Sequence, residues 1–190
     1  FLLANGALNA GGIEGEIRQT LIENHKIEAI IVLPRDMFYS TDISVTLWIM
    51  NNNKKARTLN GRQLRDRGDE VLFIDLRRWN ETIYEKKYVM FSDDQITAVK
   101  KIYNDWQSAD VTAYHDVPEL CKSATIADIK AQGYSLAPSK YIEFIDHDLD
   151  IDYAKEMARI QDEMRLLMTS EELSQSMLKD AFRGIGYGID

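Results

Sequence analysis

The chain has 190 residues, of which 45% are apolar and 28% are charged, a composition typical of a globular protein. A formal net charge of -8 at pH 7 excludes a chain-wide basic surface of the kind that binds nucleic acid. Cys121 is the only cysteine, which excludes an internal disulfide and favours a reducing, cytoplasmic compartment. Apolar stretches such as residues 27–33 are far shorter than the ~20 residues of a membrane helix, so no membrane partner is expected.

The N-terminal third has the pattern of an open α/β sheet. Residues 1–4 are typical of a buried strand and lack an initiator methionine, so we expect a fragment whose N-terminal part has been removed. Ile13, Ile17 and Leu21 recur every four residues, which predicts a helix over residues 13–24 with these side chains toward the core and Arg18 outward. Residues 27–33 and 43–50 predict two buried strands, antiparallel because no helix separates them.

A sharply basic stretch follows these strands. Residues 54–67 carry six basic side chains and one acidic side chain. The turn signals Asn60-Gly61 and Gly68 lie in or next to this stretch, which has little apolar periodicity. We therefore divide the chain into the sheet of residues 1–53, an exposed basic loop or linker over residues 54–70, and a following extension.

The extension, residues 71–150, has mixed α+β signals. Residues 71–76 predict a strand, and Ser92 with Gln95 forms a capping box that opens a helix through Trp106. A short helix over residues 126–132 is expected to end at Gly133.

The C-terminal segment, residues 151–190, is predicted to form two consecutive amphipathic helices. The first carries a seam with four-three spacing, of the kind that packs against another helix: Tyr153, Met157, Ile160, Met164 and Leu167. Thr169 and Glu172 form a second capping box, after which apolar residues continue on a new phase: Leu173, Met177 and Phe182. This segment is acidic, with five basic and twelve acidic side chains over residues 143–190.

Several catalytic chemistries are excluded by spacing. The glycines near the C-terminus follow a helix instead of a strand, which excludes a dinucleotide fingerprint, and no phosphate-binding loop motif occurs. The acids between residues 146 and 152 lack the glycine and the glutamate that a calcium loop needs. The three histidines and Cys121 have no metal-ligand spacing. The chain therefore offers no catalytic residue and no metal site of its own.

Three stretches together point to one protein family. Residues 12–18 read Gly-Ile-Glu-Gly-Glu-Ile-Arg and lead to Met37-Phe38-Tyr39-Ser40-Thr41-Asp42-Ile43 and the strand to Met50. Residues 133–141 fit the pattern Gly-Tyr-x-Leu-x-Pro-Ser-Lys-Tyr, and the terminal helices end in Gly-Tyr-Gly. This combination resembles the modification subunit of type I restriction-modification systems. The resemblance implies an adenine-specific DNA methyltransferase that uses S-adenosylmethionine as methyl donor.

Two family motifs are missing from the chain. The aromatic and glycine-rich cofactor turn is absent, and so is the catalytic Asn-Pro-Pro-aromatic loop, because the only prolines are Pro34, Pro118 and Pro138. Both motifs lie upstream in the family. The resemblance therefore implies the C-terminal part of a Rossmann-like methyltransferase sheet, followed by an α+β extension and helices. We expect this part to be inactive alone and to bind no cofactor.

The resemblance also implies roles for particular residues. By position, Phe38 matches the aromatic that stacks on an adenine flipped out of the duplex, with Tyr39 as the alternative. Phe38 as a plain core residue is an equally open interpretation. The basic side chains are candidates for DNA phosphate contacts, against the alternative of a merely solvated loop: Lys54, Lys55, Arg57, Arg62, Arg65 and Arg67.

The helical segment has a role in the family as well. In type I enzymes the C-terminal helices of the modification subunit pack against the specificity subunit, so the apolar seam is expected to be a subunit interface. The expected partners are the specificity subunit, the restriction subunit and DNA. The alternatives are a seam that closes on its own domain, and a stand-alone interaction module whose first strand is covered on both sides within this chain.

Overall fold

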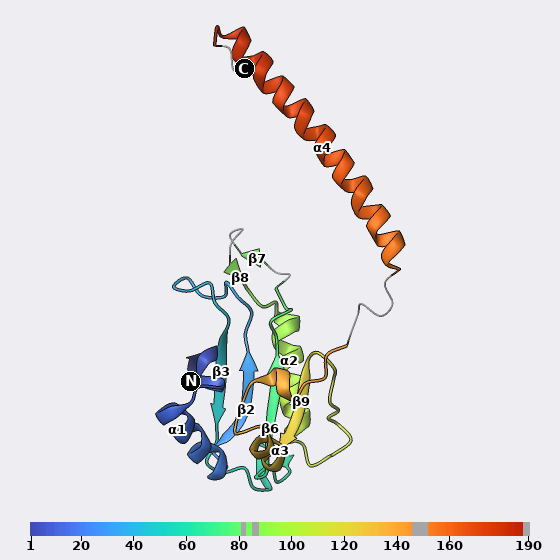
Figure 1. Cartoon of the computed structure of the whole chain (residues 1–190). Coiled ribbons are helices and arrows are strands. Elements are labelled where there is room, and N and C mark those ends of the chain that lie inside the picture. The colour runs from blue at the N-terminus through green and yellow to red at the C-terminus, as the bar shows by residue number, and fades with distance from the viewer. Residues whose placement is uncertain (81–82, 85–87, 146–151, 188–190) are drawn as a thin grey trace. The chain divides into compact units, whose positions relative to one another are not determined.

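The computed structural model describes residues 1–80, 83–84, 88–145 and 152–187 (Figure 1). The chain divides into two compact units, Phe1–Ile145 and Asp146–Asp190. Most of the acidic run ahead of the terminal helix, residues 146–151, lies outside the described residues. In the part of the chain that is described, no helix is long and apolar enough to cross a membrane.

A five-stranded mixed sheet forms the centre of the first unit, in the order β1-β3-β2-β6-β9. Its strands are β1 (Leu2–Ala4), β2 (Ile27–Val32), β3 (Val45–Met50), β6 (Glu70–Asp75) and β9 (Cys121–Thr125). β2 and β6 are parallel, whereas β3 is antiparallel to both β1 and β2, and β9 is antiparallel to β6. The sequence prediction of an α/β sheet with an antiparallel strand pair is confirmed.

Helices cover both faces of this sheet. On one face, Ile30 and Phe73 pack with α1 (Gly12–Glu23) and α3 (Ile126–Ala131). On the other face, side chains such as Ile31 pack against α2 (Asp93–Gln107), which contributes the buried Trp106. Because neighbouring residues of a strand point to opposite faces and both faces are covered, β2 is buried along its whole length, including its one charged residue, Glu28.

The predicted boundary between sheet and extension does not interrupt the sheet. β9 lies within the predicted extension, residues 71–150, and β6 begins one residue before it. Nevertheless β6 pairs directly with β2. The first unit therefore runs continuously to Ile145. The strand β9 was not predicted, because its sequence Cys-Lys-Ser-Ala-Thr has few of the large apolar residues that mark a buried strand.

Shorter elements connect these layers. The basic stretch, expected as a loop, contains the hairpin β4 (Arg57–Leu59) and β5 (Arg62–Leu64). Asn60 and Gly61 both have positive φ, the conformation that a two-residue hairpin turn requires and that Asn-Gly favours. The remaining short elements are the 3-10 turns η1 (Asn5–Leu8) and η2 (Pro138–Lys140) and the strands β7 (Ile83–Tyr84) and β8 (Tyr88–Val89).

The helix α2 begins at the predicted capping box. Ser92 Oγ accepts a hydrogen bond from the Gln95 backbone N–H, and Gln95 Oε1 accepts one from the Ser92 backbone N–H. Thr125 and Asp128 form another capping box, at the start of α3, that was not predicted from the sequence. These reciprocal bonds satisfy backbone donors that a helix start leaves without partners.

The helix α1 is oriented differently from the prediction. Ile13 is 76% exposed and Ile17 56% exposed, whereas Arg18 is buried. The Arg18 guanidinium donates hydrogen bonds to the backbone oxygens of Ala7, Ala10 and Tyr134, at 2.8 to 3.0 Å. The apolar periodicity predicted a helix correctly but assigned its buried side wrongly, because three backbone acceptors hold Arg18 inside.

The second unit contains one continuous helix, α4 (Tyr153–Gly184), of 32 residues. The prediction of two helices with a new start at Thr169 is therefore wrong. Thr169 Oγ1 donates a hydrogen bond to the Arg165 backbone oxygen at 2.9 Å, one turn earlier in the same helix. A threonine hydroxyl makes this contact within helices as readily as it caps a helix start, so the capping pattern was a false signal.

Candidate functional site

The loop between β2 and β3 lies beyond the carboxyl end of β2, the place where open α/β sheets bind their ligands. Ser44 Oγ closes its base with a hydrogen bond of 2.5 Å to the Leu33 backbone oxygen. A bridge between Phe38 and Thr41 forms its tip, with the Thr41 N–H donating to the Phe38 oxygen at 3.3 Å. These bonds fix the backbone on both sides of the tip.

The two predicted base-stacking residues have different surroundings at this tip. Phe38 is half-buried and packs against the core cluster on the α2 face of the sheet. Tyr39 is 73% exposed, and its ring centroid lies 4.2 Å from that of Tyr88 on β8. A pocket of about 410 Å³ opens between these segments, lined by Asp36, Phe38, Tyr39, Ser40, Thr41, Asp42 and Tyr88. Its lining combines aromatic rings with hydroxyl and carboxylate groups.

A second polar group lies at the same edge of the sheet. Asp75, at the carboxyl end of β6, is opposite Val32 at the end of β2 and is buried. Its carboxylate accepts hydrogen bonds from Arg77, with Arg77 Nη2 at 2.5 Å, and this pairing raises the pKa of Arg77. This pair was not predicted, although a carboxylate at the end of an apolar strand is a usable signal for the edge where sites form.

The prediction that the basic stretch is an exposed loop is wrong. Arg67 and Lys54 are buried, with 1% and 4% of their surface exposed. Arg67 Nε donates to Glu28 Oε1 at 3.2 Å, and Lys54 Nζ donates to the Ile27 backbone oxygen at 2.9 Å. Glu28, the second residue of β2, is fully buried, and a buried carboxylate requires a cation and hydrogen bonds nearby. The structure therefore rules Lys54 and Arg67 out as exposed phosphate contacts.

The same network involves neighbouring side chains. Arg65 is half-buried and forms an ion pair with Glu70, at 2.7 Å between Nη2 and Oε2, and this hydrogen-bonded pairing lowers the pKa of Glu70. Gln107 Nε2 donates to Glu28 Oε1 at 2.8 Å. Burial lowers the pKa of Lys54 to about 8, because the ammonium group loses its contact with water. These contacts join the basic stretch to the sheet and to α2.

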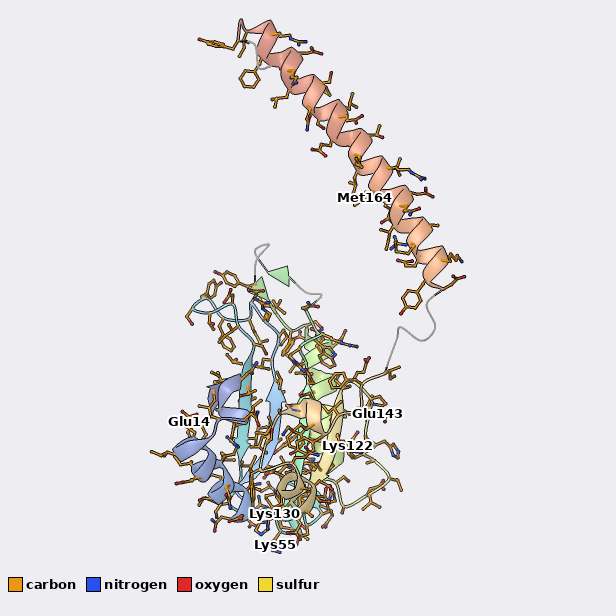
Figure 2. All side chains as sticks on the ribbon, in the orientation of Figure 1. Glu14, Lys55, Lys122, Lys130, Glu143 and Met164 are labelled. Atoms are coloured by element: carbon orange, nitrogen blue, oxygen red, sulfur yellow. The ribbon has the colours of Figure 1, made fainter. Side chains whose placement is uncertain are left out.

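The remaining basic residues lie at the other end of the sheet from the β2–β3 loop. Met50 at the end of β3 pairs with Ile27 at the start of β2, so the chain that follows begins at the amino edge of β2. Figure 2 shows Lys55 at that end of the first unit. Lys55 and Arg62 are exposed and Arg57 is half-buried. The two groups predicted to contact DNA are thus separated by the length of a strand.

An apolar groove runs along the β1 edge of the sheet. It has a volume of about 480 Å³ and is lined mainly by apolar side chains, with Glu14 and Arg18 as its charged members: Phe1, Leu3, Ala7, Glu14, Ile17, Arg18, Leu21, Trp48 and Met50. Leu2 is also 52% exposed. The first strand is therefore not covered on both sides by the described part of this chain, contrary to what the stand-alone module requires.

The helix α4 has an uncovered apolar surface. None of its described residues is buried, and every member of the predicted first seam is exposed, by 42% at Ile160 and up to 71% at Leu167. Leu178 and Phe182 follow Ile160 and Met164 by about five helical turns and return to this seam. Met177 lies roughly a third of a turn, and Leu173 nearly half a turn, from the centre of this seam. The continuous helix thus has one main seam with a side branch.

The described residues contain no group of three or more histidine, cysteine, aspartate or glutamate side chains that could hold a metal ion. Residues 1–149 match the family model described as N-6 DNA Methylase. The chain belongs to the N-6 DNA methylase family. Thus the resemblance drawn from the residue motifs is confirmed.

Curated relatives of this methylase chain are type I enzyme subunits. The HindI methylase subunit of Haemophilus influenzae is 30% identical over 98% of this chain, and the MjaIX methylase subunit of Methanocaldococcus jannaschii is 29% identical over 98%. The chain spans 40% and 32% of the lengths of these two relatives. It therefore corresponds to well under half of each protein.

Solved structures support the same fold. The methyltransferase subunit of a type I restriction-modification system from Streptococcus thermophilus superposes with a TM-score of 0.59 and 24% identity, over 76% of this chain and 26% of that chain. The M protein of the type I restriction enzyme EcoKI gives a TM-score of 0.51 and 18% identity, over 95% of this chain and 43% of that chain. The mixed α/β architecture of the methylase chain is therefore shared with these subunits.

Proposed function

We propose that the methylase chain is the C-terminal part of the modification subunit of a type I restriction-modification enzyme. The complete subunit would transfer a methyl group from S-adenosylmethionine to the exocyclic amine of adenine in DNA. The observation that carries this proposal is the N-6 DNA Methylase match over residues 1–149. Relatives that carry the type I methylase name across 98% of the chain support it further.

S-adenosylmethionine does not fit the residues of this chain. The glycine-rich cofactor turn and the Asn-Pro-Pro-aromatic loop are absent from the sequence. The groove at β1 is lined mainly by apolar side chains, which offer few partners for the ribose and the charged amino acid end of the cofactor. We therefore assign cofactor binding and methyl transfer to the remainder of the subunit, and we expect the chain alone to be inactive.

The exposed groove supports the interpretation as a part of a larger subunit. Phe1 is 80% exposed and Ile17 56% exposed beside β1, which is an edge strand of the sheet in the described part of the chain. Burial of apolar surface stabilises a protein by roughly 25 cal/mol per Å², so covering a groove of this kind is energetically favourable. We infer that polypeptide of the same subunit outside these 190 residues covers it.

The contribution of this chain to the reaction would be to hold the target base. An adenine inside a duplex cannot reach a methyl donor, so the base must be flipped out and held by stacking. The β2–β3 loop offers Phe38 and Tyr39 at the carboxyl edge of the sheet. Phe38 would support the loop from the core, and the exposed Tyr39 would present its ring to the base.

We further propose that α4 docks on the specificity subunit within a complex that also contains the restriction subunit and DNA. The exposed seam of α4 suits a helix-bundle contact, and its methionines can adapt to a partner surface. The single cysteine, Cys121, is buried and unpaired, which suits a cytoplasmic complex.

Co-expression tests the proposal directly. The full-length subunit should co-purify with its specificity subunit and methylate DNA with labelled S-adenosylmethionine, whereas the 190-residue chain should not methylate. Removal of residues 151–190 from the full-length subunit should abolish co-purification. Unchanged co-purification after this truncation would remove α4 from the interface, and methylation by the chain alone would overturn its assignment as an incomplete part.

A further inference from the structure

The strand β8 brings an aromatic residue from a distant part of the sequence to the tip of the β2–β3 loop. The ring centroids of Tyr39 and Tyr88 are 4.2 Å apart with a tilt of 53° between the ring planes. This contact joins two segments that lie far apart in the chain. In Figure 1 β7 and β8 are drawn at the same end of the sheet as the end of β2.

Backbone geometry fixes this position. The Val89 N–H donates a hydrogen bond of 2.9 Å to the Asp36 backbone oxygen, and Val89 is buried. Asp36 has a φ of 58°, so the loop backbone turns at the residue that receives this bond. Tyr88 pairs with Tyr84 in the β7–β8 ladder. The backbone at Tyr88 is therefore held by main-chain pairing on its own strand and, through Val89, by the loop.

The pocket beside these rings has a chemistry that suits a nucleobase. Two tyrosine rings supply apolar, polarisable surface on which any base can stack. Ser40 and Thr41 supply hydroxyls, and Asp36 and Asp42 supply carboxylates that can accept hydrogen bonds from an amino group. Two acidic side chains disfavour a phosphate at the same place. A volume of about 410 Å³ is in the range of small-molecule pockets.

We propose that Tyr88 contacts the target base together with Tyr39, so that the base site of the methylase is built from the β2–β3 loop and β8. This inference rests on the proposed function, and it adds a residue that lies outside the motifs of the sequence resemblance. At 4.2 Å the rings are too close to enclose a base between them. The base therefore stacks on the outer side of the pair.

The wild-type protein gives the first test. The full-length subunit, assembled with its specificity subunit, is bound to a duplex in which 5-iodouracil replaces the target adenine. Ultraviolet light then joins the base to the aromatic ring against which it stacks, and peptide mass spectrometry locates the junction. We expect a junction at Tyr88, either alone or beside one at Tyr39. Junctions confined to Tyr39 or to other residues would overturn the role of Tyr88 without the need for any variant.

Two substitutions give the second test. Tyr88→Phe keeps the aromatic ring, whereas Tyr88→Leu removes the ring and keeps an apolar side chain. Base stacking on an aromatic ring is worth ~1–3 kcal/mol, so Y88L should lower kcat/KM for methylation by about tenfold while Y88F stays within about twofold of the wild type. Equal unfolding midpoints would establish that both variants fold.

The outcomes separate this inference from the proposed function. A wild-type complex that methylates DNA, together with a Y88L complex of equal kcat/KM, would overturn the role of Tyr88 and leave the proposed function intact. A correctly assembled wild-type complex that fails to methylate any DNA would overturn the proposed function and this inference with it.

Discussion

Arg67 Nε donates a hydrogen bond to Glu28 Oε1 over 3.2 Å, and neither side chain is exposed to solvent. This pair connects the middle of the sheet to the basic stretch, 39 residues later in the chain. Gln107 of α2 donates to the same carboxylate oxygen. One buried carboxylate thus holds three segments of the first unit together.

Removal of one partner should destabilise the chain strongly. Glu28→Gln leaves the Arg67 charge buried without compensation, so we expect a loss of about 3–5 kcal/mol in the free energy of unfolding. Urea denaturation of the full chain measures this loss. The matched control is Lys55→Ala, which breaks the exposed Lys55–Asp66 pair and should cost less than about 1 kcal/mol. Equal losses in the two variants would contradict a stabilising role of the buried pair.

The buried ammonium of Lys54 should make stability depend on pH. Its pKa in the folded chain is about 8, whereas an unfolded lysine has about 10.4, so the unfolded chain binds more protons between these values. The free energy of unfolding therefore rises with pH across this window. Relative to Lys54→Met, the wild type should gain about 1–2 kcal/mol between pH 8 and pH 10. A wild-type-to-variant difference that stays constant over this range would show that the folded lysine titrates normally.

Substitutions of Phe38 and of Tyr39 should differ in their effects on stability and on methylation. Phe38→Ala in the full-length subunit removes a half-buried ring from the core and should cost about 2 kcal/mol of stability as well as methylation rate. Tyr39→Ala removes an exposed ring and should cost less than about 1 kcal/mol, yet lower the methylation rate. Unfolding curves and methyl transfer on the same preparations compare the two. Full methylation by Y39A would remove Tyr39 from the base site.

Charges placed on the seam of α4 should block subunit assembly. Met157→Glu with Met164→Glu puts two acidic groups on the seam, and the dissociation constant for the specificity subunit should rise by at least about 100-fold, or ~2.7 kcal/mol. Ala154→Glu with Ala158→Glu adds the same charge away from the seam and several turns before Leu173, and this pair serves as the control. Calorimetry or co-purification compares the pairs. If both pairs weaken assembly equally, net charge and not the seam is responsible.

The exposed basic residues call for a test by salt dependence. Each phosphate that a basic side chain neutralises adds roughly 1 to the slope of log binding constant against log salt concentration. Lys55→Gln or Arg62→Gln in the complete complex should therefore reduce that slope by roughly 1 if the side chain binds a phosphate. Lys100→Gln, an exposed lysine of α2, is the control. Because Lys55 lies at the other end of the sheet from the base loop, an unchanged slope would limit DNA binding to the carboxyl edge.

The sequence predicted the elements that depend on strong local patterns. The strands β2, β3 and β6 follow largely apolar runs, and the start of α2 follows the pairing of Ser92 with Gln95. The burial of Lys54 and Arg67 was not predicted, because charged residues are exposed by default. Glu28, a carboxylate inside an apolar run, was the available signal that a cation must be buried nearby.

The site could be predicted only in part, because it depends on contacts between segments that lie far apart in the chain. The β2–β3 loop was located by motif, but Tyr88 reaches it through pairing between segments far apart in the chain. In α1, the spacing of Ile13 and Ile17 identified an apolar side without indicating what covers it. Local periodicity states which side chains prefer burial, whereas tertiary contacts decide whether the burial occurs within this chain.

The helix α4 has a consequence for the protein before assembly. Its 32 residues have no buried side chain among those described, so its free energy of folding comes from intrinsic helix propensity and from any partner that covers the seam. An unassembled copy would present this seam to proteases and chaperones, whereas an assembled copy would hide it. We expect the cellular lifetime of the subunit to follow the supply of its partner, which would keep the subunits of the complex in balance.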